Sequence, residues 1–272
     1  MTLPPGHAGG RIHVRSDLMD ELFTPTTVID WYTTQEGITT DEIGVAPVAV
    51  VSWGKRVIES LADVIGAQSA DYWLYTDRHP LYKGQVAGLD VSFAHLPVGA
   101  PGTVMLMEEM IACGARTIIG LGWAGSLQAT APIGCFLIPT SCVSEEGTSA
   151  HYDDGNVSFA PAFDLVDALE KAALDKGVEV VKGPLWTTDA PYRELRSKVQ
   201  GYRDQGVLGV DMETSAMYAL GSFRNIKVCN LLIVSDELAD DWRPAFRTPQ
   251  LRAANEKAME IILHLLSTQV SI

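Results

Sequence analysis

VLGVDMETSAMYALGSFRNIKVCNLLIVSDEL, residues 207–238, contains the clearest pattern of the chain. The apolar runs at 207–210 and 228–234 are typical of buried strands. The segment between them, residues 214–223, is rich in Ala, Met and Leu and predicts a helix. A strand, a helix and a second strand in succession indicate an α/β protein.

Two acidic spots interrupt these apolar surroundings. Asp211 and Glu213 follow the first strand, and Asp236 lies at the end of the second. An unpaired buried charge is costly, so each carboxylate is expected to be paired or to have a function. The alternatives are structural: Glu213 would be a carboxylate stabilised by the N-terminus of the helix, and Asp236 would cap the loop after its strand.

Length and composition leave the number of domains open but exclude several classes of protein. The chain has 272 residues, 47% of them hydrophobic, which suits one large α/β domain or two small ones. Its formal charge is −14 and it has no basic run, which argues against partners such as nucleic acid or an anionic membrane surface. It has no apolar run of about 18 residues and no N-terminal h-region, so neither a membrane helix nor a signal peptide is predicted.

The cysteines and histidines give no sign of a metal or a disulfide framework. The four cysteines form no CxxC motif, and the six histidines form no HxH or HExxH. We therefore expect reduced thiols in a cytoplasmic protein, with no metal and no cofactor.

The remaining elements alternate along the chain. Residues 1–44 give the weakest pattern, with only a short helix expected at 18–23. Further strands are predicted at 45–51, 72–75, 89–96, 117–121, 135–139, 178–181 and 184–188. Further helices are predicted at 57–65, 103–113, 163–176 and 249–266, and one more follows the loop at 187–194 and ends near 205.

Residues 120–125, GLGWAG, match the GxGxxG pattern after a strand. A dinucleotide-binding fingerprint also requires a helix that opens on the third glycine. Here APIG at 131–134 and a new strand at 135–139 follow, which leaves no room for that helix. We therefore predict a glycine-rich loop whose free backbone N–H groups suit an oxyanion or a sugar hydroxyl. Arg56, at the start of the helix at 57–65, is a second candidate for an anion contact.

Five motifs together resemble those of the nucleoside phosphorylase I superfamily. They are AGSLQ at 124–128, IPTS with EGTSAHY at 138–141 and 146–152, WTTDAPYRE at 186–194, VDMETSAMYA at 210–219, and VSDE at 234–237. This superfamily includes purine nucleoside and uridine phosphorylases and the methylthioadenosine/adenosylhomocysteine nucleosidases. The resemblance covers about residues 85–240, in the same order.

The resemblance implies a fold and an activity. The fold would be a single three-layer α/β domain at 45–272, with a central mixed, partly barrel-like sheet flanked by helices and an N-terminal arm at 1–44. The activity would be that of a pentosyltransferase that cleaves the N-glycosidic bond of a purine-type nucleoside, most simply by phosphorolysis to base and ribose 1-phosphate. The alternatives are a phosphate-independent nucleosidase and a nucleoside-binding protein with altered catalysis. The partners would be a nucleoside, phosphate in the case of phosphorolysis, and further copies of the chain in a homo-oligomer.

By the same resemblance, several residues would hold the nucleoside. Glu213 would hydrogen-bond the ribose hydroxyls with Met212 packed against the sugar, and its charge would favour an oxocarbenium-like transition state. Asp236 would donate a proton to N7 of a purine, and because uridine phosphorylases lack this Asp, it favours purines. His13 would reach the 5′-hydroxyl in a neighbouring subunit.

The base would be lined by Tyr192 and Pro191, where the family often has Phe-Tyr. Because Pro191 departs from that pattern, Trp123 or Phe159 is expected to supply the missing stacking.

The nucleophile end departs most from the family. Gly120 and Trp123 stand where phosphorylases carry an Arg and a Ser or Thr. The Glu that activates water in the nucleosidases has no counterpart that the sequence identifies. The choice between phosphate and water therefore stays open, and the candidates for this region are Arg56, Gly122, Trp123, Ala124 and Gly125.

Overall fold

The structure is a computed structural model, and it describes residues 21–268 except 154, 156 and 240. The strands of this part are β1 (Val48–Ser52), β2 (Gln68–Ser69), β3 (Leu81–Val86), β4 (Leu89–His95), β5 (Thr117–Ser126), β6 (Phe136–Glu145), β7 (Val180–Thr188), β8 (Gly209–Asp211), β9 (Lys227–Glu237) and β10 (Arg243–Pro244). The helices are α1 (Pro25–Glu36), α2 (Thr40–Ile43), α3 (Lys55–Ile65), α4 (Ala100–Ala112), α5 (Phe163–Asp175), α6 (Arg196–Asp204), α7 (Thr214–Arg224) and α8 (Pro249–Thr268), with short 3₁₀ turns η1 (Ser149–His151) and η2 (Pro191–Arg193).

The described strands form one mixed sheet in the order β10-β9-β6-β7-β8-β5-β1-β4-β3-β2. An additional pairing of β5 with β9 closes the strands β9, β6, β7, β8 and β5 into a barrel. The pairs β5–β9 and β6–β7 are parallel, whereas β5–β8 and β6–β9 are antiparallel. The prediction of a mixed, partly barrel-like sheet is therefore confirmed.

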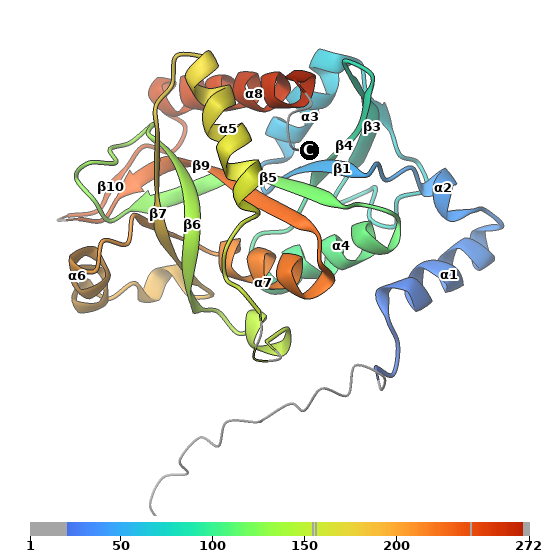
Figure 1. Ribbon diagram of the computed structural model, residues 1–272, viewed down its shortest axis with the longest axis horizontal. Helices are drawn as coiled ribbons and strands as arrows, with labels where there is room; N and C mark the ends of the chain where they lie inside the picture. Colours follow the sequence, from blue (N-terminus) through green and yellow to red (C-terminus); the bar gives the residue numbers. More distant parts are fainter. Residues whose placement is uncertain (1–20, 154, 156, 240, 269–272) are drawn as a thin grey trace, which may run out of the picture.

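Helices cover both faces of the sheet, so that the fold has three layers (Figure 1). Helices α3, α5 and α8 lie along one side, and α4 and α7 along the other. Strand β1 shows why both faces are apolar: Val48 and Val50 pack into the core under α3, α5 and α8, whereas Ala49 and Val51 pack into the core beside α4 and α7. This follows from the twofold alternation of side chains along a strand.

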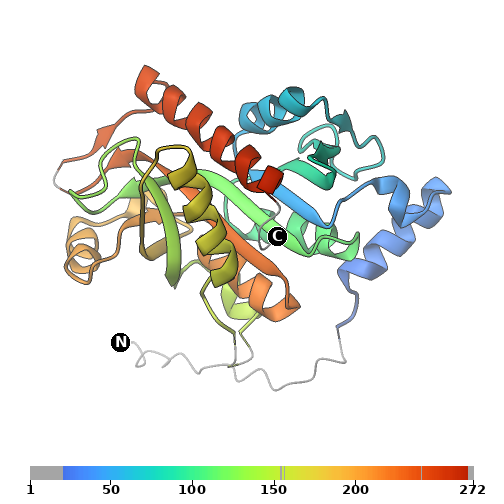
Figure 2. The ribbon, with the colours of Figure 1, turned by 45° about the horizontal axis from the view of Figure 1, so that its top comes forward.

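The N-terminal helices α1 and α2 join the side that carries α4 (Figure 2). Ile29 of α1 and Ile43 of α2 are fully buried in the core of that side. The expected short helix at 18–23 is not formed at residues 21–23, and its residues 18–20 lie outside the described part. The domain boundary expected at 44/45 stays a prediction.

Two other predictions are wrong. Residues 72–75 form turns instead of a strand, because Trp73 is buried there and its indole N–H donates to the carbonyl of His79 at 2.9 Å. The glycine-rich stretch 120–125 is no loop but the second half of β5. It pairs with β9 through Trp123↔Ile233 and with β8 through Gly125↔Val210, so its backbone lies within the sheet instead of a ligand-binding loop.

Two kinds of feature are not found in the described residues. None of their helices is both long and apolar enough to cross a membrane. Nor do any three of their His, Cys, Asp or Glu side chains group where they could hold a metal ion.

Candidate active site

Glu213 lies at the junction of β8 and α7, where it is the residue that precedes the helix. Its side chain is only 6% exposed. Its Oε1 accepts a hydrogen bond from the amide of Gly99 at 2.7 Å, and its Oε2 accepts one from the amide of Met212 at 3.3 Å. Burial raises the pKa of Glu213, and the nearby charge of Asp211 raises it further. The carboxyl group is therefore fixed in one orientation by backbone donors.

Asp211 is buried beneath Glu213 and joins three elements. It accepts hydrogen bonds from the Thr187 hydroxyl of β7 at 2.7 Å, from the Thr214 amide of α7 at 3.0 Å, and from the Thr214 hydroxyl. The Thr187 hydroxyl in turn accepts from the amide of Ser215 at 3.0 Å. Burial raises the pKa of Asp211, and these hydrogen bonds oppose that rise. Asp211 thus holds β7, β8 and the start of α7 together next to Glu213.

Asp236 lies near the end of β9, opposite Gly125 of β5. The register of the two strands shifts between Ala124 and Gly125, which is a local irregularity of the kind that redirects side chains. A Cβ atom at Gly125 would lie 2.3 Å from Leu238 and 3.3 Å from the Asp236 carboxylate. Only glycine therefore lets β5 approach this carboxylate so closely.

Both oxygens of Asp236 accept hydrogen bonds. Oδ1 accepts from the Ser235 hydroxyl at 2.7 Å, and Oδ2 accepts from the indole N–H of Trp242 at 2.9 Å. These donors hold the half-buried side chain in place near the end of the strand.

A cavity of about 340 Å³ joins the two acidic spots. It brings together seven of the predicted site residues, which are Trp123, Ala124, Gly125, Pro191, Met212, Glu213 and Asp236. These residues come from β5, η2, the β8–α7 junction and β9, and the closure of the barrel places them side by side.

Four other predicted residues do not line this cavity. Tyr192 is 98% exposed, Arg56 is exposed on α3, and Gly122 is buried inside β5. Phe159 accepts a hydrogen bond from the amide of Cys142 through its carbonyl and lies away from the cavity. His13 falls outside the described residues.

The structure adds residues that the sequence did not single out, which are Trp53, Val98, Glu194, Ser235 and Phe246. Glu194 follows η2, in a stretch whose charged residues are also typical in sequence of a solvated helix face. Its pKa is raised to about 7, first by burial and then by the charge of Asp236. Phe246 lies in the connection before α8, which carries no recognisable motif. Ser235 lies within the VSDE motif, which is the sequence signal that could have identified it.

Two tryptophans, Trp53 and Trp123, line the smaller cavity. The indole N–H of Trp123 donates to Asn255 at 3.0 Å, and that of Trp53 donates to Thr103 at 2.8 Å. A Cβ atom at Gly54 would lie 2.4 Å from the ring of Trp123, and one at Gly122 would lie 2.4 Å from the ring of Trp53. These glycines thus make room for indole rings.

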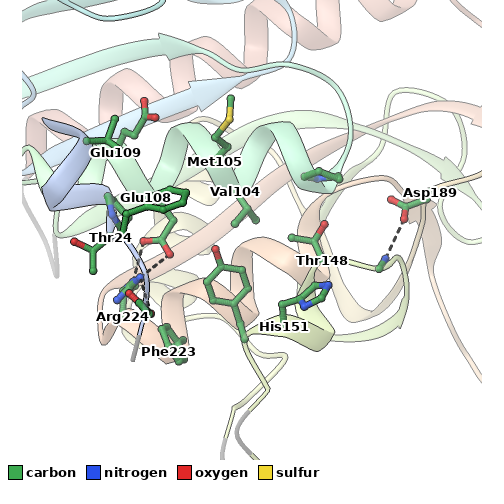
Figure 3. A pocket seen from close by; sticks show the side chains of 17 residues that line it. Thr24, Val104, Met105, Glu108, Glu109, Thr148, His151, Asp189, Phe223 and Arg224 are labelled. Atoms are coloured by element: carbon green, nitrogen blue, oxygen red, sulfur yellow. Dashed lines mark hydrogen bonds and ion pairs between the residues drawn. The ribbon is translucent and has the colours of Figure 1, made fainter. Parts of the chain in front are cut away.

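A second, larger cavity of about 720 Å³ lies beside α4 and η1 (Figure 3). Arg224 forms an ion pair there with Glu108 at 2.8 Å, and Asp189 accepts from the amide of Gly147 at 3.0 Å. Neither Glu213 nor Asp236 lines this cavity. The smaller cavity, which Glu213 and Asp236 both line, is therefore the candidate active site.

Residues 49–267 match the family model of the phosphorylase superfamily. The chain belongs to this superfamily. The match spans the sheet from β1 to β9 and nearly all of α8, so it includes every element that positions Glu213 and Asp236. Membership in the phosphorylase superfamily confirms the resemblance seen in the sequence motifs.

Named relatives of the superfamily are similar over most of the fold. A guanosine phosphorylase of Halorubrum lacusprofundi is 24% identical over 204 residues, which cover 75% of this chain and 84% of the relative. A DeoD-type purine nucleoside phosphorylase of Bacillus cereus is 30% identical over 160 residues, or 58% of this chain and 68% of the relative. The crystal structure of a purine nucleoside phosphorylase from Toxoplasma gondii in complex with immucillin-H has the same fold, with a TM-score of 0.76, 23% identity, and coverage of 84% of this chain and 93% of that one.

Proposed function

We propose that this protein cleaves the N-glycosidic bond of a purine nucleoside, most simply by transfer of the ribosyl group to phosphate. One observation carries the proposal: a buried, backbone-oriented Glu213 and a hydrogen-bonded Asp236 line one cavity. The relatives support it, because their names are guanosine phosphorylase and purine nucleoside phosphorylase.

The sugar belongs at Glu213. The ribose hydroxyls would donate to this carboxylate, and Met212, which lines the same cavity, would pack against the ring. As the C–N bond breaks, positive charge develops on the ribosyl group, and a nearby anion stabilises it more strongly than it stabilises the ground state. Burial strengthens this interaction because little water screens it.

The base belongs at the end formed by Asp236, Glu194, Pro191 and Phe246. The exposed ring of Phe246 is available for stacking on a purine. A purine leaves more readily when its ring nitrogen is protonated. The carboxyl groups that line this end of the cavity are the candidates to donate that proton.

Hydrolysis is the second candidate reaction, and the two tryptophans favour it. The rings of Trp53 and Trp123 occupy the region in which the superfamily pattern predicts phosphate contacts. An indole presents one N–H donor, and both of these donors are already bound to Thr103 and Asn255. Water needs less space and fewer donors than a phosphate dianion.

A substrate panel tests the proposal. Purified protein would be incubated with inosine, guanosine or adenosine, each with and without phosphate, and the free base would be measured. Base and ribose 1-phosphate that form only with phosphate establish phosphorolysis, whereas base release without phosphate establishes hydrolysis. Binding of a nucleoside without turnover under both conditions would contradict the proposal and leave a binding protein of the same fold.

We further propose that the protein acts as a homo-oligomer in the cytoplasm. Val98, which lines the smaller cavity, and Met105, which lines the larger one, are 66% and 48% exposed, which suits a surface that a second copy covers. The four free thiols fit a reducing compartment. Light scattering of the purified protein tests the assembly, and a monomer at micromolar concentration would contradict it.

A further inference from the structure

We propose that Glu194 delivers the proton to the leaving base and that Asp236 is its anionic partner. The proposal rests on the proposed function and specifies which carboxyl group acts at the base end. Both side chains line the same cavity, and they come from different elements: Glu194 follows η2, and Asp236 lies on β9.

Asp236 is built as a hydrogen-bond acceptor. Its two oxygens accept from the Ser235 hydroxyl and from the Trp242 indole at 2.7 and 2.9 Å. Trp242 has an N–H that can only donate, so Oδ2 of Asp236 is engaged as an acceptor in this contact. Both oxygens of Asp236 are thus already engaged with donors of the protein.

Glu194 has the opposite surroundings. No other described residue donates a hydrogen bond to its carboxyl group, and the side chain is half-buried between the cavity and the adjoining surface. Burial and the charge of Asp236 raise its pKa to about 7, so it holds a proton near neutral pH. Two carboxyl groups whose surroundings differ in this way commonly divide the roles of acid and anion.

Other charged groups also lie near Glu194. Asp211 and Glu213 line the same cavity from the β8–α7 junction, and burial raises the pKa of each of them. Arg196 lies on the adjoining surface and forms an ion pair with Asp241 at 3.2 Å.

The Glu194 carboxylic acid gives its proton to a ring nitrogen of the base while the electron pair of the C1′–N bond moves to the base. The oxygen of phosphate or water forms the new bond to C1′. The proton that this nucleophile loses to solvent balances the one that Glu194 takes up again, so the enzyme returns to its starting state.

The test compares Glu194→Gln with the wild type on two substrates. Guanosine needs a proton on its leaving base, whereas 7-methylguanosine carries a cationic base that leaves without one. We expect Glu194→Gln to lower kcat on guanosine at pH 6 by about 100-fold and to remove the fall in kcat above about pH 7. On 7-methylguanosine the variant should stay within about threefold of the wild type. Equal losses on both substrates, or no loss on either, would overturn the proposal.

Asp236→Asn distinguishes the role of Asp236 from that of Glu194. Loss of the negative charge should lower the pKa of Glu194, so the fall in kcat on guanosine should begin at a lower pH while turnover at pH 5 persists. Loss of guanosine turnover at every pH with 7-methylguanosine turnover intact would make Asp236 the donor and overturn the proposal. Failure of the proposed function is distinguishable, because the wild type would then turn over neither nucleoside, and this role for Glu194 would fall with it.

Discussion

The carboxylate of Glu213 accepts a hydrogen bond from the backbone amide of Gly99 at 2.7 Å, across 114 positions of sequence. Gly99 has a φ of +99°, a conformation that favours glycine, and it immediately precedes α4. The group proposed to hold the sugar is thus oriented by the backbone of a distant turn. Because the donor is the main-chain amide of Gly99, it remains in place when Glu213 is substituted, so such substitutions test the Glu213 carboxyl group alone.

Glu213→Gln keeps an acceptor for the Gly99 amide but removes the carboxyl group that can ionise as positive charge develops on the sugar. We expect kcat/KM for a purine ribonucleoside to fall about 100-fold, because the charge acts mainly in the transition state. Glu256→Gln, an exposed substitution on α8, is the matched control and should be neutral. Steady-state kinetics with thermal unfolding of both variants measures this, and an unchanged kcat/KM would remove Glu213 from the mechanism.

Phe246→Ala should weaken binding of the base. The Phe246 ring lines the cavity while still exposed, so its removal costs stacking and little folding energy. We expect KM for the nucleoside to rise about tenfold, which corresponds to a stacking contribution of about 1–3 kcal/mol. Phe163→Ala provides the control, since Phe163 is similarly exposed on α5 and does not line the cavity. Equal KM values for the two variants would argue against a base contact.

Gly120→Ala should destabilise the fold, because a Cβ atom there would lie 2.2 Å from Oδ1 of the buried Asn230. We expect a loss of about 1–3 kcal/mol in the free energy of unfolding. Gly201→Ala is the opposite case: Gly201 lies within α6 with nothing near the added methyl group, so stability should rise by about 0.5–1 kcal/mol. Urea titration of both variants measures the difference. Equal effects would contradict the packing seen around β5.

Arg224→Met should cost more stability than Arg243→Met. Arg224 of α7 donates two hydrogen bonds to Glu108 of α4, at 2.8 and 2.9 Å, and the Glu108 side chain is only 9% exposed. Its loss should destabilise by about 2–4 kcal/mol because it leaves a largely buried carboxylate without its partner. The Arg243–Glu237 pair has an arginine that is 71% exposed and should contribute about 0–1 kcal/mol. Similar unfolding midpoints for both variants would contradict this ranking.

The stability contributed by Glu194 should decrease as pH rises. Its pKa in the folded protein is raised to about 7 from an ordinary value of 4.5, so the folded state binds its proton more tightly than the unfolded state does. The contribution is complete below about pH 4.5 and is lost as pH rises through about 7. The unfolding free energy of the wild type minus that of Glu194→Gln should therefore decrease by about 1–3 kcal/mol between pH 5 and pH 8. A difference that is constant with pH would mean that the pKa of Glu194 is not raised.

Local pattern alone predicted much of the core. The strand, helix and strand of residues 207–238 appear as β8, α7 and β9, because apolar periodicity reports directly which faces are buried. The order of the motifs gave the family, and it marked Glu213 and Asp236 as the two ends of one site. Rejection of the dinucleotide fingerprint was also correct, since β5 runs on through those glycines and no helix opens there.

Only the tertiary structure decided what lies between those two ends. In the sequence the glycines of β5 resemble a ligand-binding loop. In the folded sheet they instead allow close packing, of Gly122 against Trp53 and of Gly120 against Asn230. Glu194 and Phe246 enter the cavity from connections without periodicity, and the charge of Asp236 acts on Glu194 only because the fold brings two distant segments together. Sequence encodes local preference and burial, whereas the surroundings of a carboxyl group are set by long-range contacts that no local pattern contains.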